Sequence, residues 1–343
     1  MKKYQVLFIT HRGERHQNEA LSAAPSEFEI TMLRSPSKDE ILSHLPGKDF
    51  LITERSGVID EDMIRAGQNL KLIQRLGSLT HDIDLEAAKK AGIPVSYLPV
   101  KSCILVAEHM IMQILSLSKR LPEMMAITAS ANDYGATPKV CDEDYFAYNW
   151  ANVKDIKGIW GSTVGILGFG EIGAEVARRL NGYGCTILYN KRSPLPTFAE
   201  EELNIQFVSK EELLKLSDTV CMLLPFFTET AQSLDSAFFS AMKPGSLFVS
   251  CGGSGVVDEH ALTEALTNGH LYGAALDTFT MEPISPENPL LKLVDNPKIN
   301  LILTPHTAAG TPYTQPELNE TRTADYINLK RITQGEKISG RVV

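Results

Sequence analysis

The stretch TVGILGFGEIGAEVARRL, residues 163–180, decides the fold class of this chain. An apolar run at residues 164–167 predicts a buried strand, and an amphipathic helical segment follows after a short turn. The turn reads Gly168-x-Gly170-x-x-Gly173, in which the first glycine permits a tight bend, the second lets a pyrophosphate approach the backbone, and the third allows close packing of helix on strand. N–H groups at the helix start would then face the phosphates. The stretch predicts a dinucleotide-binding turn, with an ordinary strand–turn–helix as the alternative.

The same alternation of strand and helix continues toward the C-terminus. Six strands are expected, at residues 163–167, 186–189, 219–224, 247–250, 273–276 and 301–303. Strands separated by helices of this length predict a doubly wound parallel sheet. Residues 103–309 are therefore predicted to form a Rossmann dinucleotide-binding domain.

The first hundred residues alternate in the same way and predict a second doubly wound, flavodoxin-like domain. Its expected strands are residues 4–10, 50–53, 72–76 and 95–98, and its expected helices are residues 38–44, 60–66 and 84–91. A tail helix at about residues 316–334 could return to this domain. Residues 1–102 and 310–343 are thus predicted to form a substrate domain, and the fold class is α/β with two parallel-sheet domains.

A helix and a polar stretch separate the two series. Residues 102–121 are apolar on most faces and predict a buried helix that ends at Pro122. Residues 128–158 are polar and irregular but contain several aromatic side chains. This pattern predicts a surface excursion or an interface arm.

Composition and charge exclude several classes of function. The net charge of -9, from 42 acidic and 33 basic side chains, disfavours a nucleic-acid partner. No apolar run approaches the length that spans a membrane, and the N-terminal run is too short for a signal peptide. The five cysteines are dispersed, without metal-ligand spacing, so we expect no metal, no disulfide and a cytoplasmic location.

The choice of coenzyme depends on the residues that follow the second strand of the nucleotide-binding series. An acidic residue about twenty positions after the glycines would bind the ribose 2′-hydroxyl of NAD. This chain has Asn190, Lys191 and Arg192 there instead. Two cations without a carboxylate predict a preference for NADP(H). The alternative is that both are solvated loop charges and that NAD is the coenzyme.

The order of motifs resembles that of the D-isomer-specific 2-hydroxyacid dehydrogenase family from about residue 50 to about residue 338. The matching motifs are Leu72-Ile73-Gln74-Arg75-Leu76-Gly77 with Asp82-Ile83-Asp84, Val106-Ala107-Glu108-His109, the Gly168 turn, Asp218 with Pro225-Phe226-Phe227-Thr228-Glu229-Thr230, Val257-Asp258-Glu259, Leu276-Asp277, Glu282-Pro283 and Thr304-Pro305-His306.

The resemblance implies roles for three residues. His306 would exchange a proton with the substrate oxygen, Glu282 would orient its ring and favour its protonated form, and Asp277 would bind the nicotinamide carboxamide. The alternatives are that His306 is an ordinary loop residue and that Glu282-Pro283 is only a turn. The resemblance also implies a homodimer with contacts through the coenzyme domain, and an active site between the two domains that closes around the nicotinamide.

The expected coenzyme-binding residues are Gly168, Gly170, Glu171, Ile172, Gly173, Asn190, Lys191, Arg192, Leu224, Pro225, Thr230, Cys251, Gly252, Asp277 and His306.

The chain departs from the family pattern at two places that concern the substrate carboxylate. The family has an arginine five residues before Asp258, and this chain has Gly253. A bidentate Arg–carboxylate contact has no substitute in a glycine turn. Ser78-Leu79 stands where the family has a small residue and glycine, and Leu79 would crowd the carboxylate. Both changes suggest an altered substrate.

Residues elsewhere could replace the missing cation. Lys101 lies just before the long helix and is the first candidate, although a surface lysine at a helix start is the simpler interpretation. Arg55 and Arg75 are weaker candidates.

Three functions compete. The first is an NADP(H)-dependent reductase or dehydrogenase acting on a small 2-oxo or 2-hydroxy acid or on an altered carbonyl substrate. The second is a coenzyme-binding regulatory relative with little or no turnover, in which the turn at Gly252 and the aromatic stretch serve an interface. The third is a lyase or isomerase that uses bound coenzyme internally, with Cys251 as an extra reactive group, although a buried strand-end residue is the simpler interpretation of Cys251.

Overall fold

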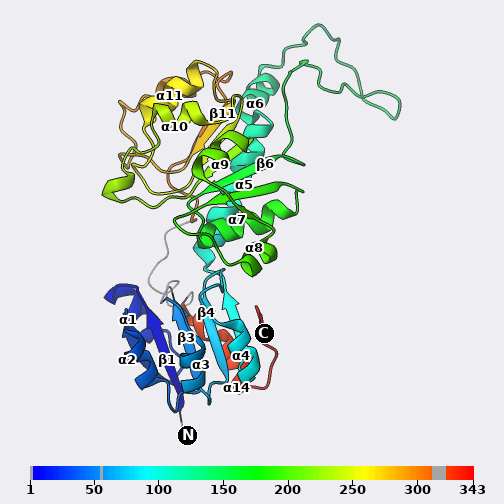
Figure 1. Ribbon diagram of the computed structural model, residues 1–343. Helices are drawn as coiled ribbons and strands as arrows, with labels where there is room; N and C mark the ends of the chain where they lie inside the picture. Colours follow the sequence, from blue (N-terminus) through cyan, green and yellow to red (C-terminus); the bar gives the residue numbers. More distant parts are fainter. Residues whose placement is uncertain (1–2, 55–56, 311–321) are drawn as a thin grey trace. The chain divides into compact units, whose positions relative to one another are not determined.

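The computed structural model describes residues 3–54, 57–310 and 322–343, which fall into two compact units (Figure 1). The first unit draws on Met1–Ile104, Leu195–Ala199 and Gly310–Val343, and the second on Leu105–Pro194 and Glu200–Ala309. Each unit is built on one parallel sheet, so the prediction of two parallel-sheet α/β domains is confirmed.

The first unit has a five-stranded sheet in the order β2-β1-β3-β4-β5, which is the flavodoxin-like order. Its strands are β1 (Tyr4–Thr10), β2 (Phe28–Arg34), β3 (Phe50–Glu54), β4 (Leu72–Leu76) and β5 (Val95–Leu98). Its helices are α1 (Glu14–Ser22), α2 (Lys38–His44), α3 (Glu61–Ala66), α4 (Leu85–Ala91) and α14 (Ile327–Thr333), with a 3₁₀ turn η2 (Ala324–Tyr326). Asp60 and Asp84 cap α3 and α4 by accepting hydrogen bonds from Met63 N and Ala87 N, which is why these helices begin where the sequence predicts.

Two elements of this unit are not predicted from the sequence. Strand β2 lies at the edge of the sheet, and only Phe28 among its residues is fully buried, so its apolar pattern is weak. Helix α1 begins at Glu14, and its N-cap residue is Gly13, which has no side chain to cap it. Neither element therefore carries the signals on which a prediction depends.

The tail of the chain packs into the first unit. Part of the expected helix at residues 316–334 lies outside the described residues, and α14 follows at Ile327. Tyr326 is fully buried, and its hydroxyl donates to the Ala20 carbonyl oxygen at 2.7 Å. Val95 N also donates to Val343 O at 3.4 Å, so the last residues extend the edge of the sheet beyond β5.

The second unit has a seven-stranded parallel sheet in the order β12-β11-β10-β9-β6-β7-β8, which is the Rossmann order. The strands are β6 (Thr163–Leu167), β7 (Thr186–Asn190), β8 (Gln206–Phe207), β9 (Thr219–Met222), β10 (Leu247–Ser250), β11 (Gly273–Leu276) and β12 (Leu301–Leu303). The helices between them are α7 (Glu171–Asn181), α8 (Thr197–Leu203), α9 (Lys210–Leu216), α10 (Ser236–Ala241), α11 (Glu259–Thr267) and α12 (Leu291–Val294), with a 3₁₀ turn η1 (Thr228–Thr230).

Two details of the predicted sheet are corrected. The expectation of six strands misses β8, which has only two residues and no room for a periodic pattern. Strand β9 ends at Met222 rather than at residue 224, because the chain turns there toward the glycine turn after β6. Leu223 N still donates to Leu167 O at 2.8 Å, which holds the two strand ends together.

The predicted helix at residues 102–121 is two helices, so its expected end at Pro122 is wrong. Helix α5 (Lys101–Ser118) ends before Arg120, whose backbone has φ +51°, and α6 (Leu121–Ser130) begins directly afterwards. Pro122 lies in the first turn of α6, where a helix needs no N–H donor. Proline therefore starts a helix here instead of ending one.

Helix α6 and the segment that follows it lie on the surface of the second unit. No residue of α6 is fully buried. Residues 131–158 contain no helix or strand and extend away from the end of α6 (Figure 1). We call residues 131–158 the arm; it is the surface excursion that the sequence predicts.

No helix in the described ranges is long and apolar enough to cross a membrane.

Candidate active site

The glycine turn after β6 is shaped by close contacts on one side and by open space on the other. Gly168 has φ +89°, and a Cβ atom there would lie 2.6 Å from Leu224 N. A Cβ at Gly173 would lie 3.0 Å from the Phe169 ring, so α7 packs tightly on the strand. A Cβ at Gly170 would meet nothing within 4 Å. The turn is thus fixed by close contacts at Gly168 and Gly173 and open at Gly170, where α7 starts. A site for a diphosphate requires such an opening.

Asn190, at the end of β7, is part of the frame of this turn. Its carbonyl oxygen accepts hydrogen bonds from Gly168 N at 3.0 Å and Phe169 N at 3.3 Å. Its side-chain amide donates to Val208 O at 2.8 Å. These contacts place the next residues of the chain beside the glycine turn.

Lys191 and Arg192 follow Asn190 directly. Burial lowers the pKa of Lys191, the positive charge of Arg192 lowers it further, and the carboxylate of Glu171 opposes both effects. Two cations are therefore close enough to repel each other near the start of α7. An anion bound between them would relieve this repulsion.

His306 and Glu282 form an ion pair in the second unit. His306 Nδ1 lies 2.7 Å from Glu282 Oε2. Glu282 Oε1 accepts two more hydrogen bonds, from Ser254 Oγ at 2.8 Å and from Phe279 N at 3.0 Å. Partial burial acts to raise the pKa of Glu282, but the hydrogen bonds from His306, Phe279 N and Ser254 outweigh it, and the pKa is lowered. Glu282 therefore stays ionised and can hold a protonated imidazole.

Asp277 organises the segment that carries His306. Its carboxylate is fully buried, and Oδ1 accepts from Thr304 Oγ1 at 2.5 Å and from Thr307 N at 3.0 Å. Oδ2 accepts from Ala308 N at 2.8 Å. His306 itself has φ +54°, a left-handed conformation that is unusual for a residue with a side chain. Asp277 thus holds the Thr304 side chain before His306 and the backbone directly after it, and its predicted contact with the nicotinamide stays a prediction.

Helix α5 contributes two residues, His109 and Gln113, whose roles are not predicted from the sequence. His109 Nε2 lies 3.1 Å from Thr304 Oγ1 and 3.6 Å from Asp277 Oδ1. Burial lowers the pKa of His109, although the charge of Asp277 opposes the shift. Gln113 Nε2 lies 3.5 Å from the same Thr304 oxygen. The spacing of His109 and Gln113, four positions apart on one helix face, was the available signal.

Cys251 lies next to this network and is a free, partly buried cysteine. Its Sγ donates to Gln113 Oε1 at 3.4 Å. Burial, together with the charge of Asp277, raises the pKa of Cys251 far above its usual range. The thiol is therefore protonated, which argues against the lyase or isomerase interpretation that gives Cys251 a chemical role.

The loop after β9 and the turn after β10 lie against each other. Gly253 N donates to Leu224 O at 2.8 Å. Thr230 Oγ1 accepts from Phe227 N at 2.7 Å and donates to Pro225 O at 2.9 Å, so it closes the loop. A Cβ atom at Gly252 would lie 2.8 Å from Leu224 O.

The structure thus brings the expected site residues of this part of the second unit together; they are Leu224, Pro225, Thr230, Cys251 and Gly252.

The candidate substrate residues of the first unit are mostly used in its packing. Ser78 and Leu79 are buried. Arg75 is buried too, and its Nε lies 3.0 Å from Asp82 Oδ2, so it is not available as the replacement cation. Lys101 is exposed at the start of α5.

Arg55 lies outside the described residues. Among the residues that are described, no group of three or more His, Cys, Asp or Glu side chains is placed to hold a metal ion.

The chain matches one family profile and several known proteins. The family profile described as D-isomer specific 2-hydroxyacid dehydrogenase, NAD binding domain, matches residues 111–308. A D-3-phosphoglycerate dehydrogenase of Archaeoglobus fulgidus is 30% identical over 305 residues, which cover 88% of this chain and 53% of the relative. The chain thus spans about half the length of that relative. A hydroxypyruvate reductase of Thermotoga maritima is 31% identical over 322 residues, covering 92% of this chain and 94% of that protein.

A crystal structure of a Pyrococcus horikoshii protein matches 99% of this chain and 95% of its own, with 26% identity and a TM-score of 0.55.

Proposed function

Because the chain belongs to the D-isomer specific 2-hydroxyacid dehydrogenase family, we propose that it is an NAD(P)-dependent oxidoreductase. Its substrate would be a small 2-oxo or 2-hydroxy acid or an altered carbonyl compound. The observation that carries the proposal is the ion pair of His306 with Glu282, whose nearest atoms are 2.7 Å apart. An imidazole held by an ionised carboxylate is a proton donor and acceptor suited to carbonyl–alcohol chemistry near neutral pH.

The second unit fits a nicotinamide dinucleotide. Gly170 opens on free space at the start of α7, where the N–H groups of Glu171 and Ile172 would meet a diphosphate. When bound, the coenzyme supplies or accepts the hydride. Leu224, Pro225, Thr230 and Gly252 would line its path toward His306, and Asp277 would hold the segment that carries that residue.

His306 would move the proton. Glu282 accepts from Nδ1, which fixes the ring and leaves Nε2 to exchange a proton with the substrate oxygen. Three donors converge on Glu282, which lowers its pKa and keeps it ionised, so it can accept from the His306 ring throughout the reaction. Asp277 acts through the backbone, by holding Thr307 N and Ala308 N.

We propose NADP(H) as the preferred coenzyme. Lys191 and Arg192 stand together where a carboxylate would bind a ribose hydroxyl. The repulsion from Arg192 contributes to the lowered pKa of Lys191, and a 2′-phosphate would be attracted to both.

The test is coenzyme oxidation with the full chain against 2-oxo acids, aldehydes and ketones, with coenzyme binding measured separately by calorimetry. We expect turnover of at least one class of carbonyl compound. Tight coenzyme binding without turnover of any of them would favour the second candidate, a coenzyme-binding regulatory relative. The observation that favours this candidate is the glycine at position 253 in place of the arginine.

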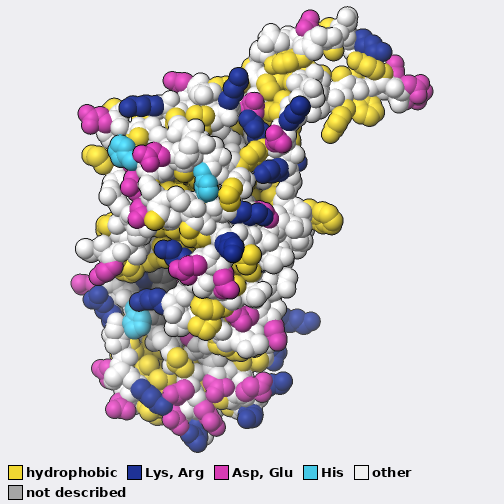
Figure 2. Space-filling model, turned by 45° about the horizontal axis from the view of Figure 1, so that its top comes forward, with side chains coloured by type: hydrophobic (Ala, Val, Ile, Leu, Met, Phe, Trp, Pro, Cys, Tyr) yellow, Lys and Arg dark blue, Asp and Glu magenta, His cyan; other side chains and the backbone are white. Residues whose placement is uncertain are grey.

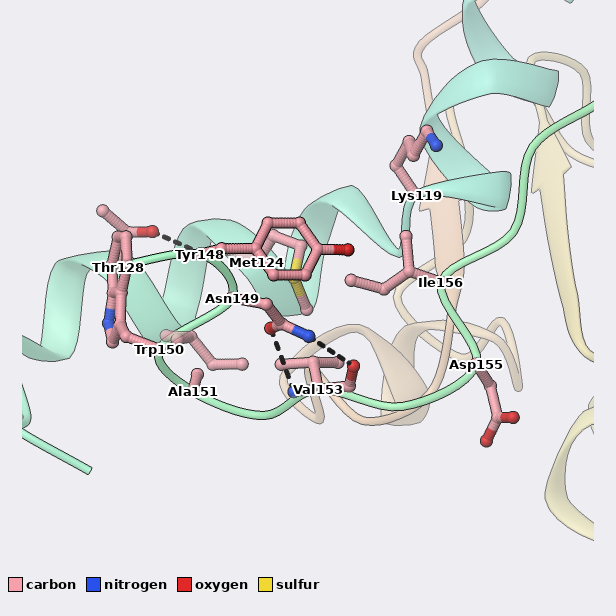
Figure 3. A pocket seen from close by; sticks show the side chains of 11 residues that line it. Lys119, Met124, Thr128, Tyr148, Asn149, Trp150, Ala151, Val153, Asp155 and Ile156 are labelled. Atoms are coloured by element: carbon pink, nitrogen blue, oxygen red, sulfur yellow. Dashed lines mark hydrogen bonds between the residues drawn. The ribbon is translucent and has the colours of Figure 1, made fainter. Parts of the chain in front are cut away.

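We also propose that the chain forms a homodimer in the cytoplasm through α6 and the arm. Large apolar side chains of the arm are exposed, including Val140 at 87%, Phe146 at 73% and Tyr148 at 85% (Figure 2). A hollow of about 580 Å³ lies between α6 and the end of the arm (Figure 3). The Asn149 side chain forms a local turn at the end of the arm. Its Nδ2 donates to Val153 O at 3.0 Å, and its Oδ1 accepts from Val153 N at 3.1 Å.

Sedimentation of the full chain tests the dimer. A second copy would cover these apolar side chains, which a monomer leaves in water. We expect a dimer that the double variant Phe146→Ser, Tyr148→Ser converts to monomers with the same circular dichroism. A monomeric parent protein at micromolar concentration would contradict the proposal.

A further inference from the structure

The glycine at position 253 is required by the packing around it. A Cβ atom there would collide with Phe226 N, and would lie 2.9 Å from both the Pro225 carbonyl carbon and Phe226 Cβ. Backbone atoms cannot move aside as the end of a flexible side chain can. The loop after β9 is further fixed by Gly253 N, which donates to Leu224 O at 2.8 Å. An arginine at position 253 is therefore excluded by the close packing of the turn after β10 against the loop after β9.

Phe226 covers the turn that this approach creates. Its ring atoms Cε2 and Cδ2 would lie 3.3 and 3.5 Å from a Cβ atom placed at Gly255, and the first of these distances is tighter than most contacts of real Cβ atoms, so the ring packs closely over this glycine. The residue is nevertheless 53% exposed, so much of its surface is open. The surface offered next to Gly253 is thus aromatic.

The same turn is joined to the acid/base pair. Ser254 directly follows Gly253, and its hydroxyl donates to Glu282 at 2.8 Å. Glu282 in turn holds His306. Phe226 therefore flanks a turn that contacts the proton-transfer pair through Ser254, and we expect part of the substrate to lie against this aromatic surface.

The two segments offer nothing that would attract a carboxylate. Residues 224–230 read LPFFTET and residues 251–255 read CGGSG, so they contain no lysine, arginine or histidine and one carboxylate, that of Glu229. The polar side chains of the turn are engaged elsewhere, Cys251 with Gln113 and Ser254 with Glu282. An anionic group lying against these two segments would gain no lysine or arginine partner from them and would lose part of its hydration.

We propose that the substrate group lying against this turn is uncharged and apolar or aromatic, with Phe226 as the specificity-determining residue. The substrate class is then a neutral ketone, aldehyde or keto ester instead of a free 2-oxo acid. The inference rests on the proposed function and deepens it. In the reduction, the carbonyl carbon gains a hydride from the reduced coenzyme and the oxygen gains a proton from His306, giving an alcohol and oxidised coenzyme.

A matched pair of substrates tests this. Phenylpyruvate and its methyl ester share the ring and the reacting ketone and differ in the charge of the acid group. We expect kcat/KM for the ester to exceed that for the acid by at least about tenfold, the loss that an unpaired charge at this position implies. Equal or better turnover of the acid would overturn the inference while leaving the proposed function intact. No turnover of either compound by a protein that reduces another carbonyl compound would overturn the inference alone, whereas no turnover of any carbonyl compound, with coenzyme bound, would overturn the proposed function as well.

Variants separate Phe226 from its neighbour. Phe226→Ala should raise KM for the phenyl ester about fivefold or more, with a smaller effect on methyl pyruvate, which has no ring to stack. Phe226→Leu, which keeps an apolar side chain, should have an intermediate effect and guards against a folding defect. Phe227→Ala is the matched control, because Phe227 is 52% exposed but lies farther along the loop. If Phe226→Ala and Phe227→Ala change KM equally, Phe226 does not determine specificity.

Discussion

Ser254 Oγ donates a hydrogen bond of 2.8 Å to Oε1 of Glu282, whose other oxygen holds His306. A hydroxyl from the turn after β10 thus fixes the carboxylate that orients the acid/base residue. This contact joins the turn that lacks an arginine to the part of the site that performs proton transfer.

Removal of this hydroxyl should move the pH profile. The hydrogen bond helps to lower the pKa of Glu282, so Ser254→Ala should raise that pKa. The ionised carboxylate is the active form, and its loss on acidification should therefore begin at a higher pH than in the parent protein. We expect kcat/KM to fall roughly three- to tenfold and the acidic limb to move up by less than about one pH unit. An unshifted limb would mean that Ser254 has only a structural role.

His306→Asn should remove proton transfer and leave coenzyme binding in place. General acid–base catalysis contributes about 10²- to 10⁴-fold, and we expect kcat to fall by that factor. The coenzyme dissociation constant, measured by calorimetry, should change less than about threefold. A variant that retains most of the parent kcat would show that another group moves the proton.

The paired cations should set the coenzyme preference. Arg192→Ala should lower kcat/KM for NADPH about tenfold, because one charge-assisted contact with the 2′-phosphate is lost. The value for NADH should change little. Lys210→Ala, which removes an exposed lysine at the start of α9, is the matched control. A parent protein that prefers NADH would contradict the assignment of NADP(H).

An arginine introduced at position 253 should destabilise the protein and should not produce activity on 2-oxo acids. Its Cβ atom would collide with the Phe226 backbone, and overpacking of this kind costs about 1–3 kcal/mol. We expect Gly253→Arg to lower the free energy of unfolding in urea by about that amount without producing activity on 2-oxo acids. Gly13→Arg is the control, because a Cβ atom there meets nothing within 4 Å. A Gly253→Arg protein that is as stable as the parent and active on 2-oxo acids would contradict this prediction, because it would show that the loop carrying Phe226 can move to admit the side chain.

Asp325 should make the stability of the protein depend on pH. Burial raises its pKa to about 7, and Arg322 opposes this shift. The folded chain then holds one proton more than the unfolded chain between about pH 4 and pH 7. This contribution is present in full below about pH 4 and is lost as the pH rises through 7.

Asp325→Asn removes that titration. Relative to this variant, the parent should lose of the order of 2–4 kcal/mol of unfolding free energy between pH 4.5 and pH 8, measured by urea unfolding. Asp62→Asn, a change at an exposed carboxylate, is the control. The difference in unfolding free energy between the parent and this variant should show no such trend with pH. A parallel pH dependence of the parent and Asp325→Asn would contradict the assignment.

The sequence predicts features that local pattern determines. The buried strands of both sheets, the glycine turn at Gly168 and the helix starts at Asp60 and Asp84 follow from periodicity and from capping residues. The order of motifs also led to His306 and Glu282, which the structure places 2.7 Å apart.

Other features depend on contacts between distant segments, which no local pattern contains. The collision that forbids a side chain at Gly253 comes from the backbone of Phe226, and Ser254 bonds to a carboxylate 28 positions away. The break between α5 and α6 reflects one left-handed residue, Arg120. Strand β2 was missed because an edge strand buries little.

The left-handed backbone at His306 has a consequence for the history of such a site. The backbone directly after His306 is held from the interior, where the buried carboxylate of Asp277 accepts from Thr307 N and Ala308 N. Residues on the open side can therefore be exchanged one after another while the imidazole keeps its place. A protein whose acid/base histidine is held in this way can change its substrate through substitutions elsewhere in the site, while the histidine stays in position.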